Sequence, residues 1–165
     1  MNNKLKRISK EEIYLNELNN SNSWNNLCYH YKLNEDIIEQ FSDKVNWLYV
    51  SIRQDLSEQF IEKYQDKVNW EYISMYQKLS EQFIERHLDK INWEYISKHQ
   101  KLSEDFIVKY SNKLDWYNVS KFQKLSESFI DQFADKLNWR NIIMHQSLSE
   151  LFIEKHLDKM DWLDI

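Results

Sequence analysis

Glycine and proline are both absent from this chain of 165 residues. Glycine adopts positive φ angles at no steric cost, and both residues commonly mark turns. Their absence excludes the Gly-rich phosphate-binding loop, the dinucleotide-binding fingerprint and the nucleophile elbow, because each motif requires glycine at fixed positions. It also disfavours tight two-residue hairpins, which prefer Asn-Gly or Asp-Gly.

Cysteine and strong charge are scarce as well. Cys28 is the single cysteine, so an intrachain disulfide is excluded and a reducing compartment is indicated. The formal charge of −5, from 27 acidic and 22 basic residues, gives no general attraction to nucleic acid. Residues 1–7 include basic side chains, but no apolar signal segment follows them and no stretch is long enough to cross a membrane. We therefore expect a cytoplasmic protein without a membrane partner.

The tryptophans recur with a constant period of 23 residues. They are Trp24, Trp47, Trp70, Trp93, Trp116, Trp139 and Trp162. The register holds without insertion from Trp24 to the last residue. A constant period of this length is the signature of a stacked repeat array.

Each repeat contains two helix starts. The first is the Asn or Asp before each Trp, and this cap is found at Asn46, Asn69, Asn92, Asp115, Asn138 and Asp161. The second lies ten residues after the Trp, at Asn34, Ser57, Ser80, Ser103, Ser126 and Ser149. The spacing predicts two short helices in each repeat, of roughly eight and eleven residues. Helices this short are unstable alone, so stacking must stabilise them.

The pattern as a whole favours an all-α protein, a right-handed-type α-solenoid of about six two-helix repeats with terminal caps. Residues 1–23 lack the Trp and read as an N-terminal capping helix, in which Ser9 and Glu12 form a capping box. Residues 24–165 form the solenoid, with a unit beginning at each Trp.

Helical periodicity separates the predicted core from the predicted surface. On the first helix, the Trp and the residues three and six positions later are expected to face the core, whereas the residues one and five positions later face solvent. The recurring aromatic residues are interpreted as a stacked core. On the second helix, acidic and basic lines run side by side, which predicts an inter-repeat ion-pair ladder such as Glu62 with Arg86, or Glu85 with Lys63.

Catalytic and metal-binding patterns are missing from the sequence. The five histidines occupy aromatic repeat positions and are interpreted as packing residues. No paired-cysteine or His-Glu-x-x-His spacing occurs, so we expect no metal and no cofactor. Cys28 stands where other repeats have serine and reads as a core thiol, and the recurring Gln reads as a hydrogen-bonding ladder between repeats. No cleft for acid–base catalysis is evident, so we expect no enzymatic activity and assign no catalytic residue.

Variation between repeats marks the candidate binding surface. The exposed positions one and five residues after each Trp change most, and they carry apolar, aromatic and basic residues of the kinds favoured at interfaces. The predicted partner-binding residues are Leu48, Ile52, Met75, Lys98, Tyr117, Lys121, Arg140 and Met144, together with Val108. The alternative explanation is that these positions vary because substitutions at a solvent-exposed surface are tolerated.

Val108 and Asn112 replace acids of the second-helix line, which predicts a local basic patch in the fourth and fifth repeats. Its lysines are Lys98, Lys101, Lys109, Lys113, Lys121 and Lys124. Such a patch suits an acidic protein loop, and a nucleic-acid backbone is a weaker alternative because the whole chain is acidic.

Two sequence blocks carry a resemblance to known repeats. These are L-S-E-x-F-I, as in Leu79–Ile84, and D-K-x-N-W, as in Asp66–Trp70. The chain resembles the short, Trp-containing helical-repeat proteins predicted in large DNA viruses, phages and AT-rich bacteria. The resemblance covers nearly all of the chain after residue 24 and implies a helical-repeat fold. It implies no activity, and a viral source would place the protein in the host cytoplasm.

The function that these observations favour is a non-catalytic repeat scaffold that binds a protein partner. A narrower form is a phage or viral inhibitor that blocks a host component. The alternatives are a small-ligand or nucleotide binder, or an enzyme, with a concave-face pocket of histidines and glutamines, and a structural protein that self-associates end to end.

Overall fold

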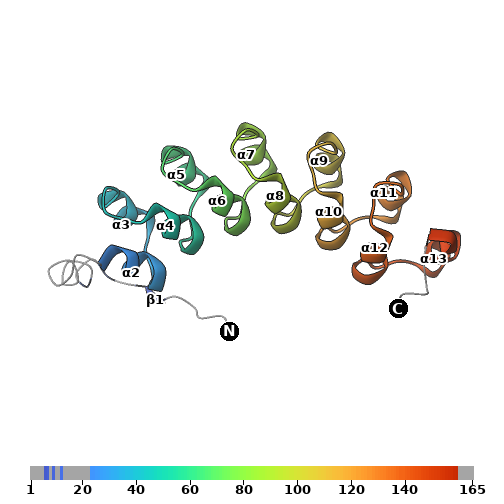
Figure 1. The fold of residues 1–165 in the computed structure, drawn as a ribbon, viewed down its shortest axis with the longest axis horizontal. Coiled ribbons are helices and arrows are strands. Elements are labelled where there is room, and N and C mark those ends of the chain that lie inside the picture. Colours follow the sequence, from blue (N-terminus) through green and yellow to red (C-terminus); the bar gives the residue numbers. More distant parts are fainter. Residues whose placement is uncertain (1–5, 8, 10–11, 13–22, 160–165) are drawn as a thin grey trace. The chain divides into compact units, whose positions relative to one another are not determined.

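The computed structural model describes residues 6–7, 9, 12 and 23–159. The chain divides into two compact units, Met1–Ile91 and Asn92–Ile165. The first unit contains the helices α2 (Ser23–His30), α3 (Glu35–Gln40), α4 (Trp47–Arg53), α5 (Glu58–Lys63), α6 (Trp70–Tyr76) and α7 (Glu81–Arg86). The even-numbered helices, which begin near a Trp, form one row and the odd-numbered helices form a second row (Figure 1).

The second unit repeats this arrangement. It contains α8 (Trp93–His99), α9 (Glu104–Lys109), α10 (Trp116–Phe122), α11 (Glu127–Gln132), α12 (Trp139–His145), α13 (Glu150–Lys155) and the 3₁₀ turn η1 (Leu157–Lys159). Its even-numbered helices again lie in one row, where α10 packs against both α8 and α12 (Figure 1). The predicted all-α, two-helix repeat is therefore confirmed.

The predicted helix starts are confirmed wherever the structure describes them. Asn46 Oδ1 accepts a hydrogen bond from the Tyr49 N–H at 3.2 Å, and Ser57 Oγ accepts one from the Phe60 N–H at 3.1 Å. The other described caps form the same bond to the residue three positions later. The predicted cap at Asp161 and the repeat unit at Trp162 lie outside the described residues.

The predicted length of the second helix is wrong. Each second helix has six residues instead of about eleven, because the chain passes into a turn at the aromatic or His residue that follows. Tyr64, for example, ends α5 with φ −113° and ψ 29° and accepts a hydrogen bond from the Lys67 N–H at 2.9 Å. Among the described residues no φ angle is positive, so these turns need no glycine.

The N-terminal segment contains a short strand as well as the predicted capping box. Strand β1 (Lys6–Arg7) pairs in parallel with β2 (Tyr31–Lys32). The Ser9 N–H donates to Glu12 Oε2 at 2.9 Å, and the Glu12 N–H donates to Ser9 Oγ at 3.2 Å, as a capping box requires. The remainder of the predicted capping helix, residues 1–5, 8, 10–11 and 13–22, lies outside the described residues.

The core lies between the two rows of helices and is formed by equivalent residues of successive repeats. Ile61, Phe83 and Ile107 represent the buried line of the second helices, and Val50 and Ile96 that of the first helices. The residue six positions after Trp was predicted to be buried, but Tyr76 and Phe122 are exposed there. The buried face is instead centred between the third and fourth positions after Trp, and position six lies about 110° away around the helix.

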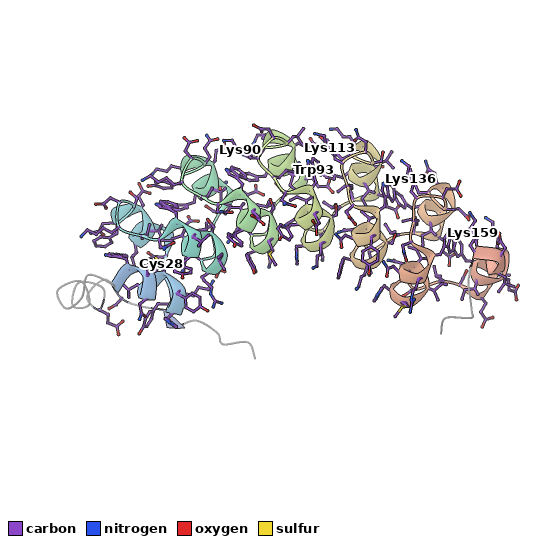
Figure 2. All side chains as sticks on the ribbon, viewed as in Figure 1. Cys28, Lys90, Trp93, Lys113, Lys136 and Lys159 are labelled. Carbon is purple, nitrogen blue, oxygen red and sulfur yellow. The ribbon has the colours of Figure 1, made fainter. Side chains whose placement is uncertain are left out.

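The six tryptophans within the described residues are half-buried, and Trp116 makes contacts on three sides. The indole N–H of Trp116 donates to the Ser111 carbonyl at 2.9 Å, and its ring stacks on Phe133 with centroids 5.5 Å apart. Lys136 Nζ lies 5.2 Å from the Trp116 ring centroid. Trp93 and Lys113 have the same relation at 5.4 Å, and Figure 2 labels both residues. These contacts link the turn before a Trp to the turn of its own repeat, which explains why the residue recurs at every period.

The Gln ladder is a set of hydrogen bonds between repeats, as predicted. Gln77 Nε2 donates to the carbonyls of Ser51 and Gln54 at 3.0 and 2.9 Å, and Gln77 Oε1 accepts from the Leu56 N–H at 3.0 Å. The same three bonds recur at Gln123 in the second unit. Buried backbone groups of one repeat are thus satisfied by the side chain of the next.

The predicted ion-pair ladder is present between second helices, and in its described pairs the cation lies one repeat after the acid. Arg86 Nε lies 4.0 Å from Glu62, and Lys63 Nζ lies 2.5 Å from Glu39. The predicted pair of Lys63 with Glu85 in the following repeat is wrong, because Lys63 reaches back to Glu39. The pairing with Glu39 shows that a base reaches the acid 24 residues earlier.

The acid that begins each second helix has a role that sequence reasoning missed. Its position was attributed to the helix dipole alone, but Glu58 accepts a hydrogen bond from the Ser80 N–H of the next repeat at 2.5 Å. Glu104 contacts the next cap in two ways, through the Ser126 N–H at 2.6 Å and the Ser126 hydroxyl at 3.0 Å. This acid therefore connects the second-helix caps of adjacent repeats.

Candidate protein-binding surface

The outer surface of the first helices is formed by the residues one, five and six positions after each Trp. Leu48, Tyr117 and Met144 are exposed as predicted, and so are Lys98 and Arg140. Ile52, Met75 and Lys121 are only half-buried, so they contribute less surface. Sequence reasoning missed the sixth position, where Tyr76 and Phe122 are exposed.

In the first unit this surface is apolar and electrically neutral. Leu48 of α4 is 41% exposed, and Ile52 of α4 and Met75 of α6 are half-buried. The only charged residues of these two helices are Arg53 and Glu71, which have opposite signs. The α4 and α6 surfaces therefore offer contact area without attraction to either charge.

In the second unit the same positions combine cations with exposed apolar side chains. We call this surface the lysine–aromatic face, formed by Lys98 of α8, Tyr117, Lys121 and Phe122 of α10, and Arg140 and Met144 of α12. Tyr117, Phe122 and Met144 are 54%, 45% and 65% exposed. Large apolar groups with this exposure on adjoining helices are typical of interaction surfaces.

Two ammonium groups lie close to the Phe122 ring. Lys121 Nζ is 5.3 Å from the ring centroid and also 5.9 Å from the ring of Tyr117. Lys98 Nζ approaches Phe122 from the neighbouring helix, at 5.7 Å. Aromatic rings attract cations through their π faces, so these contacts hold Lys98 and Lys121 on the same part of the surface.

Asn118 stands where other first helices have a tyrosine, so the ring of Phe122 has no aromatic neighbour four residues earlier on its own helix. In α6 the ring of Tyr72 lies 6.1 Å from that of Tyr76, and in α8 the ring of Tyr95 lies 6.0 Å from that of His99. Asn118 occupies the equivalent place in α10, where it is buried and offers no ring. Within the described part of the chain, Phe122 therefore makes no aromatic pair.

The charge of the lysine–aromatic face is positive although the protein is acidic. Helices α8, α10 and α12 carry a formal charge of +2, from Lys98, Lys121 and Arg140 against Glu94 alone. Partial burial and the positive charge of Lys98 both lower the pKa of His99. Across residues 23–159, no carboxylate forms an ion pair with Lys98, Lys121 or Arg140.

Val108 and much of the predicted basic patch lie away from this face. Val108 is 43% exposed on α9, in the other row of helices. Lys109 belongs to the same helix, and Lys113 follows it in the turn, over the ring of Trp93. Lys101 and Lys124 lie in the loops between helices. The six lysines therefore do not form one patch, because the two-helix repeat distributes neighbouring sequence positions over two rows.

The missing acid at position 108 is accompanied by a missing base. Acids of this line pair with the cation 24 residues later, as Asp131 does with Lys155 at 2.6 Å. The residue 24 positions after Val108 is Gln132, so both members of this rung are uncharged. The loss of the acid at position 108 therefore leaves no unpaired cation at position 132 of the next repeat.

The buried histidines serve in packing and in the ion-pair ladder. His87 Nε2 lies 2.8 Å from Glu62, and its ring contacts Trp70 with centroids 4.8 Å apart. His156 makes the same contacts with Asp131 at 2.5 Å and with Trp139 at 4.9 Å. His30, His99 and His145 were also expected in the core, but they are exposed because they occupy the sixth position after Trp.

A pocket in the first unit lies next to the Gln ladder. A shallow pocket of about 320 Å³ is lined by Asp55, Leu56, Tyr76, Gln77 and Lys78, and the Gln77 amide is already hydrogen-bonded to the backbone. Among the described residues, no three His, Cys, Asp or Glu side chains are grouped as metal ligands would be. The helices found there are also too short or too polar to cross a membrane.

The thiol of Cys28 is a core group, as predicted. Cys28 is fully buried on α2, where Figure 2 labels it. Burial raises the pKa of Cys28 to about 11, and hydrogen bonds with the backbone only partly oppose this shift. A thiol of this pKa is almost entirely protonated near pH 7 and is a poor nucleophile.

The fold and its surface define a helical tandem-repeat protein whose most distinctive exposed feature is the lysine–aromatic face. No protein-family model matches the chain, and no curated protein or solved structure is significantly similar to it.

Proposed function

We propose that this protein is a non-catalytic repeat scaffold that binds a protein partner through the outer surface of its first helices. The observation that carries the proposal is the exposure of Tyr117, Phe122 and Met144 on the adjoining helices α10 and α12. Aromatic residues, Met and Arg are the types enriched at protein interfaces.

The backbone beneath these side chains supports the proposal because it is tied down between repeats. The buried Asn141 Nδ2 donates to the Tyr117 carbonyl at 3.3 Å, and Gln146 Nε2 donates to the Gln123 carbonyl at 2.8 Å. A preformed surface loses little conformational entropy on binding, which favours affinity.

A narrower form of the proposal is that the protein is a phage or viral inhibitor that blocks a host component in the host cytoplasm. It rests on the resemblance of the 23-residue repeat alone. The alternative is a concave-face pocket built from histidines and glutamines. It is less well supported on the glutamine side, because the amides of Gln54, Gln77 and Gln123 are hydrogen-bonded to backbone carbonyls.

The test is affinity capture from lysate of the source cells with a surface variant and a matched control. The variant carries Leu48→Glu, Ile52→Lys, Tyr117→Ser and Met144→Lys on the first helices. The control has the same net charge and carries Gln59→Glu, Gln82→Lys, Gln132→Lys and Leu151→Ser, all at exposed positions of the second helices. Both proteins should unfold cooperatively at the same temperature as the wild type.

We expect one protein to be captured by the wild type and the control and lost from the first-helix variant. Capture that survives in the first-helix variant but fails in the control would move the binding surface to the second helices. Capture of no protein by the wild type would contradict the proposed function.

A further inference from the structure

We propose that the lysine–aromatic face binds an acidic segment of the partner protein in which carboxylates alternate with apolar anchor residues. This inference rests on the proposed function and adds to it the class of partner. It also selects the second unit, and not the neutral surface of α4 and α6, as the place of binding.

The first argument is the unbalanced charge of the face. Two lysines of the same unit are neutralised within the protein, because Lys155 lies 2.6 Å from Asp131 and Lys159 lies 3.0 Å from Asp135. For Lys98, Lys121 and Arg140, the described residues provide no such partner. Potentials across an interface are complementary, so an acidic partner is the one that this face would attract and orient.

The second argument is the way in which the cations are interleaved with apolar groups. The ammonium groups of Lys98 and Lys121 both lie close to the exposed Phe122, at 5.7 and 5.3 Å from its ring centroid. A carboxylate bound by both ammoniums would bring the next side chain of the ligand onto the ring of Phe122 or Tyr117. Met144 is the most exposed apolar residue of the face, and its flexible thioether adapts to different apolar anchors.

A polypeptide suits this surface better than a nucleic acid. Nucleic-acid sites gain affinity from many phosphate contacts along a positively charged track. Here the face has only three cations, helix α8 also carries Glu94, and the formal charge of the chain is −5. Tyr117 and Phe122 could stack on bases, so single-stranded DNA is included as a competing ligand in the test.

The experiment is selection of a displayed library of random 12-residue peptides on the immobilised full-length protein. Two variants use residues that the chain already has at equivalent positions. The charge variant is Lys98→Met, Lys121→Met and Arg140→Glu. The equivalent residues of other repeats are Met75 for the two lysines and Glu94 for Arg140. The ring variant is Phe122→His and Tyr117→Glu, after His99 and Glu71. Unchanged melting temperatures would verify that both variants fold.

We expect the enriched peptides to be rich in Asp and Glu with Leu, Phe or Trp between them. A synthetic representative should bind the charge variant and the ring variant about tenfold more weakly than the wild type. Its affinity for the wild type should also fall as salt rises, because the charges are exposed.

The other outcomes separate failure of the inference from failure of the proposed function. Enriched peptides that are neutral or basic, and that lose binding in the ring variant, would overturn the acidic class while supporting protein binding. Acidic peptides that bind the wild type, the charge variant and the ring variant equally would show that the binding site is not the lysine–aromatic face. Tighter binding of a 12-residue oligothymidine than of any peptide, lost in the charge variant, would overturn the inference in favour of nucleic acid. Absence of any enriched peptide, together with no captured partner, would contradict both proposals.

Discussion

The side-chain amide nitrogen of Gln77 lies 2.9 Å from the carbonyl oxygen of Gln54, the equivalent residue one repeat earlier. Gln123 and Gln100 have the same relation at 2.9 Å. A buried side chain of one repeat thus completes the backbone hydrogen bonds of the repeat before it. The repeats are therefore joined by polar contacts of defined geometry as well as by apolar packing, which determines their register.

Replacement of Gln77 should show how much this ladder contributes. Gln77→Ala leaves the carbonyls of Ser51 and Gln54 and the N–H of Leu56 without their bonds, so we expect a loss of about 3 kcal/mol in the free energy of unfolding. Urea denaturation followed by circular dichroism would measure it. The exposed Gln82→Ala should change stability by less than about 0.5 kcal/mol, and equal effects of the two variants would refute a structural role for the ladder.

Trp116 should be more important for stability than its half-buried state suggests. Trp116→Ala removes the stacking on Phe133, the hydrogen bond to Ser111 and the contact with Lys136, and we expect a loss of about 3–5 kcal/mol. Trp116→Phe keeps a ring but loses the N–H donor, so its loss should be smaller. Thermal unfolding monitored by circular dichroism would compare the three proteins. An alanine variant as stable as the phenylalanine variant would show that the ring contributes little.

Stability should fall in acid partly through Asp131. Hydrogen bonds from Lys155 and from His156 hold the pKa of Asp131 below its usual range. A carboxyl whose pKa is lowered by folding stabilises the protein above its unfolded pKa, and this stability is lost as the pH falls through the folded pKa. We therefore expect Asp131→Asn to be less stable than the wild type at pH 7, with a difference that shrinks as the pH falls below about 4.

Urea denaturation at a series of pH values would measure this difference. Asp135→Asn is a suitable control, because Asp135 is far more exposed and, among the described residues, pairs with Lys159 alone. A difference between Asp131→Asn and the wild type that stays constant from pH 3 to pH 7 would contradict the ion pair as its cause.

Cys28 should react only when the protein unfolds. Because the thiol is buried and the pKa of Cys28 is raised to about 11, a disulfide reagent such as Ellman's at pH 8 should label it slowly in the native state and at once in denaturant. Rapid labelling of the native protein would contradict the assignment as a core thiol. In the same position, Cys28→Ser should be tolerated within about 1 kcal/mol, since Ser51 and Ser97 are buried at the equivalent sites.

The uncharged rung at Val108 and Gln132 can be converted into an ion pair. Val108→Glu with Gln132→Lys copies the arrangement of Asp131 and Lys155. We expect a coupling free energy of about 0.2–1 kcal/mol in a double-mutant cycle, because the pair would be exposed. A coupling of zero at low salt would show that the second helices do not meet at this rung as they do in the others.

Much of the fold followed from the sequence because its signals are local. An Asn or Ser side chain that caps a helix bonds to a backbone N–H three residues later, so Asn69 and Ser80 could be recognised from adjacent residues alone. The length of the second helix could not be recognised in this way. The aromatic residue at its end still forms a helical hydrogen bond, although its backbone angles already belong to a turn. Periodicity alone does not distinguish these two states.

The candidate site was predicted in part for the same reason. The exposure of Leu48, Tyr117 and Met144 follows from their angle around a single helix. Phe122 was missed, because the buried face of the first helix was centred on the wrong positions, which placed the sixth residue after Trp in the core. The six lysines were grouped by their closeness in sequence, although Lys98 and Lys113 belong to different parts of the repeat.

By itself the sequence determined the 23-residue period, the two caps of each repeat, the all-α fold and the absence of positions that need glycine. These features depend on hydrogen bonds and torsion angles within a few residues, so they can be read along the chain. Only the tertiary structure decided that Glu58 bonds to the cap of the next repeat, that Trp116 lies under Lys136, and that Lys98 of one first helix meets Phe122 of the next. Those contacts join residues about one repeat apart, and their partners are chosen by how the helices stack.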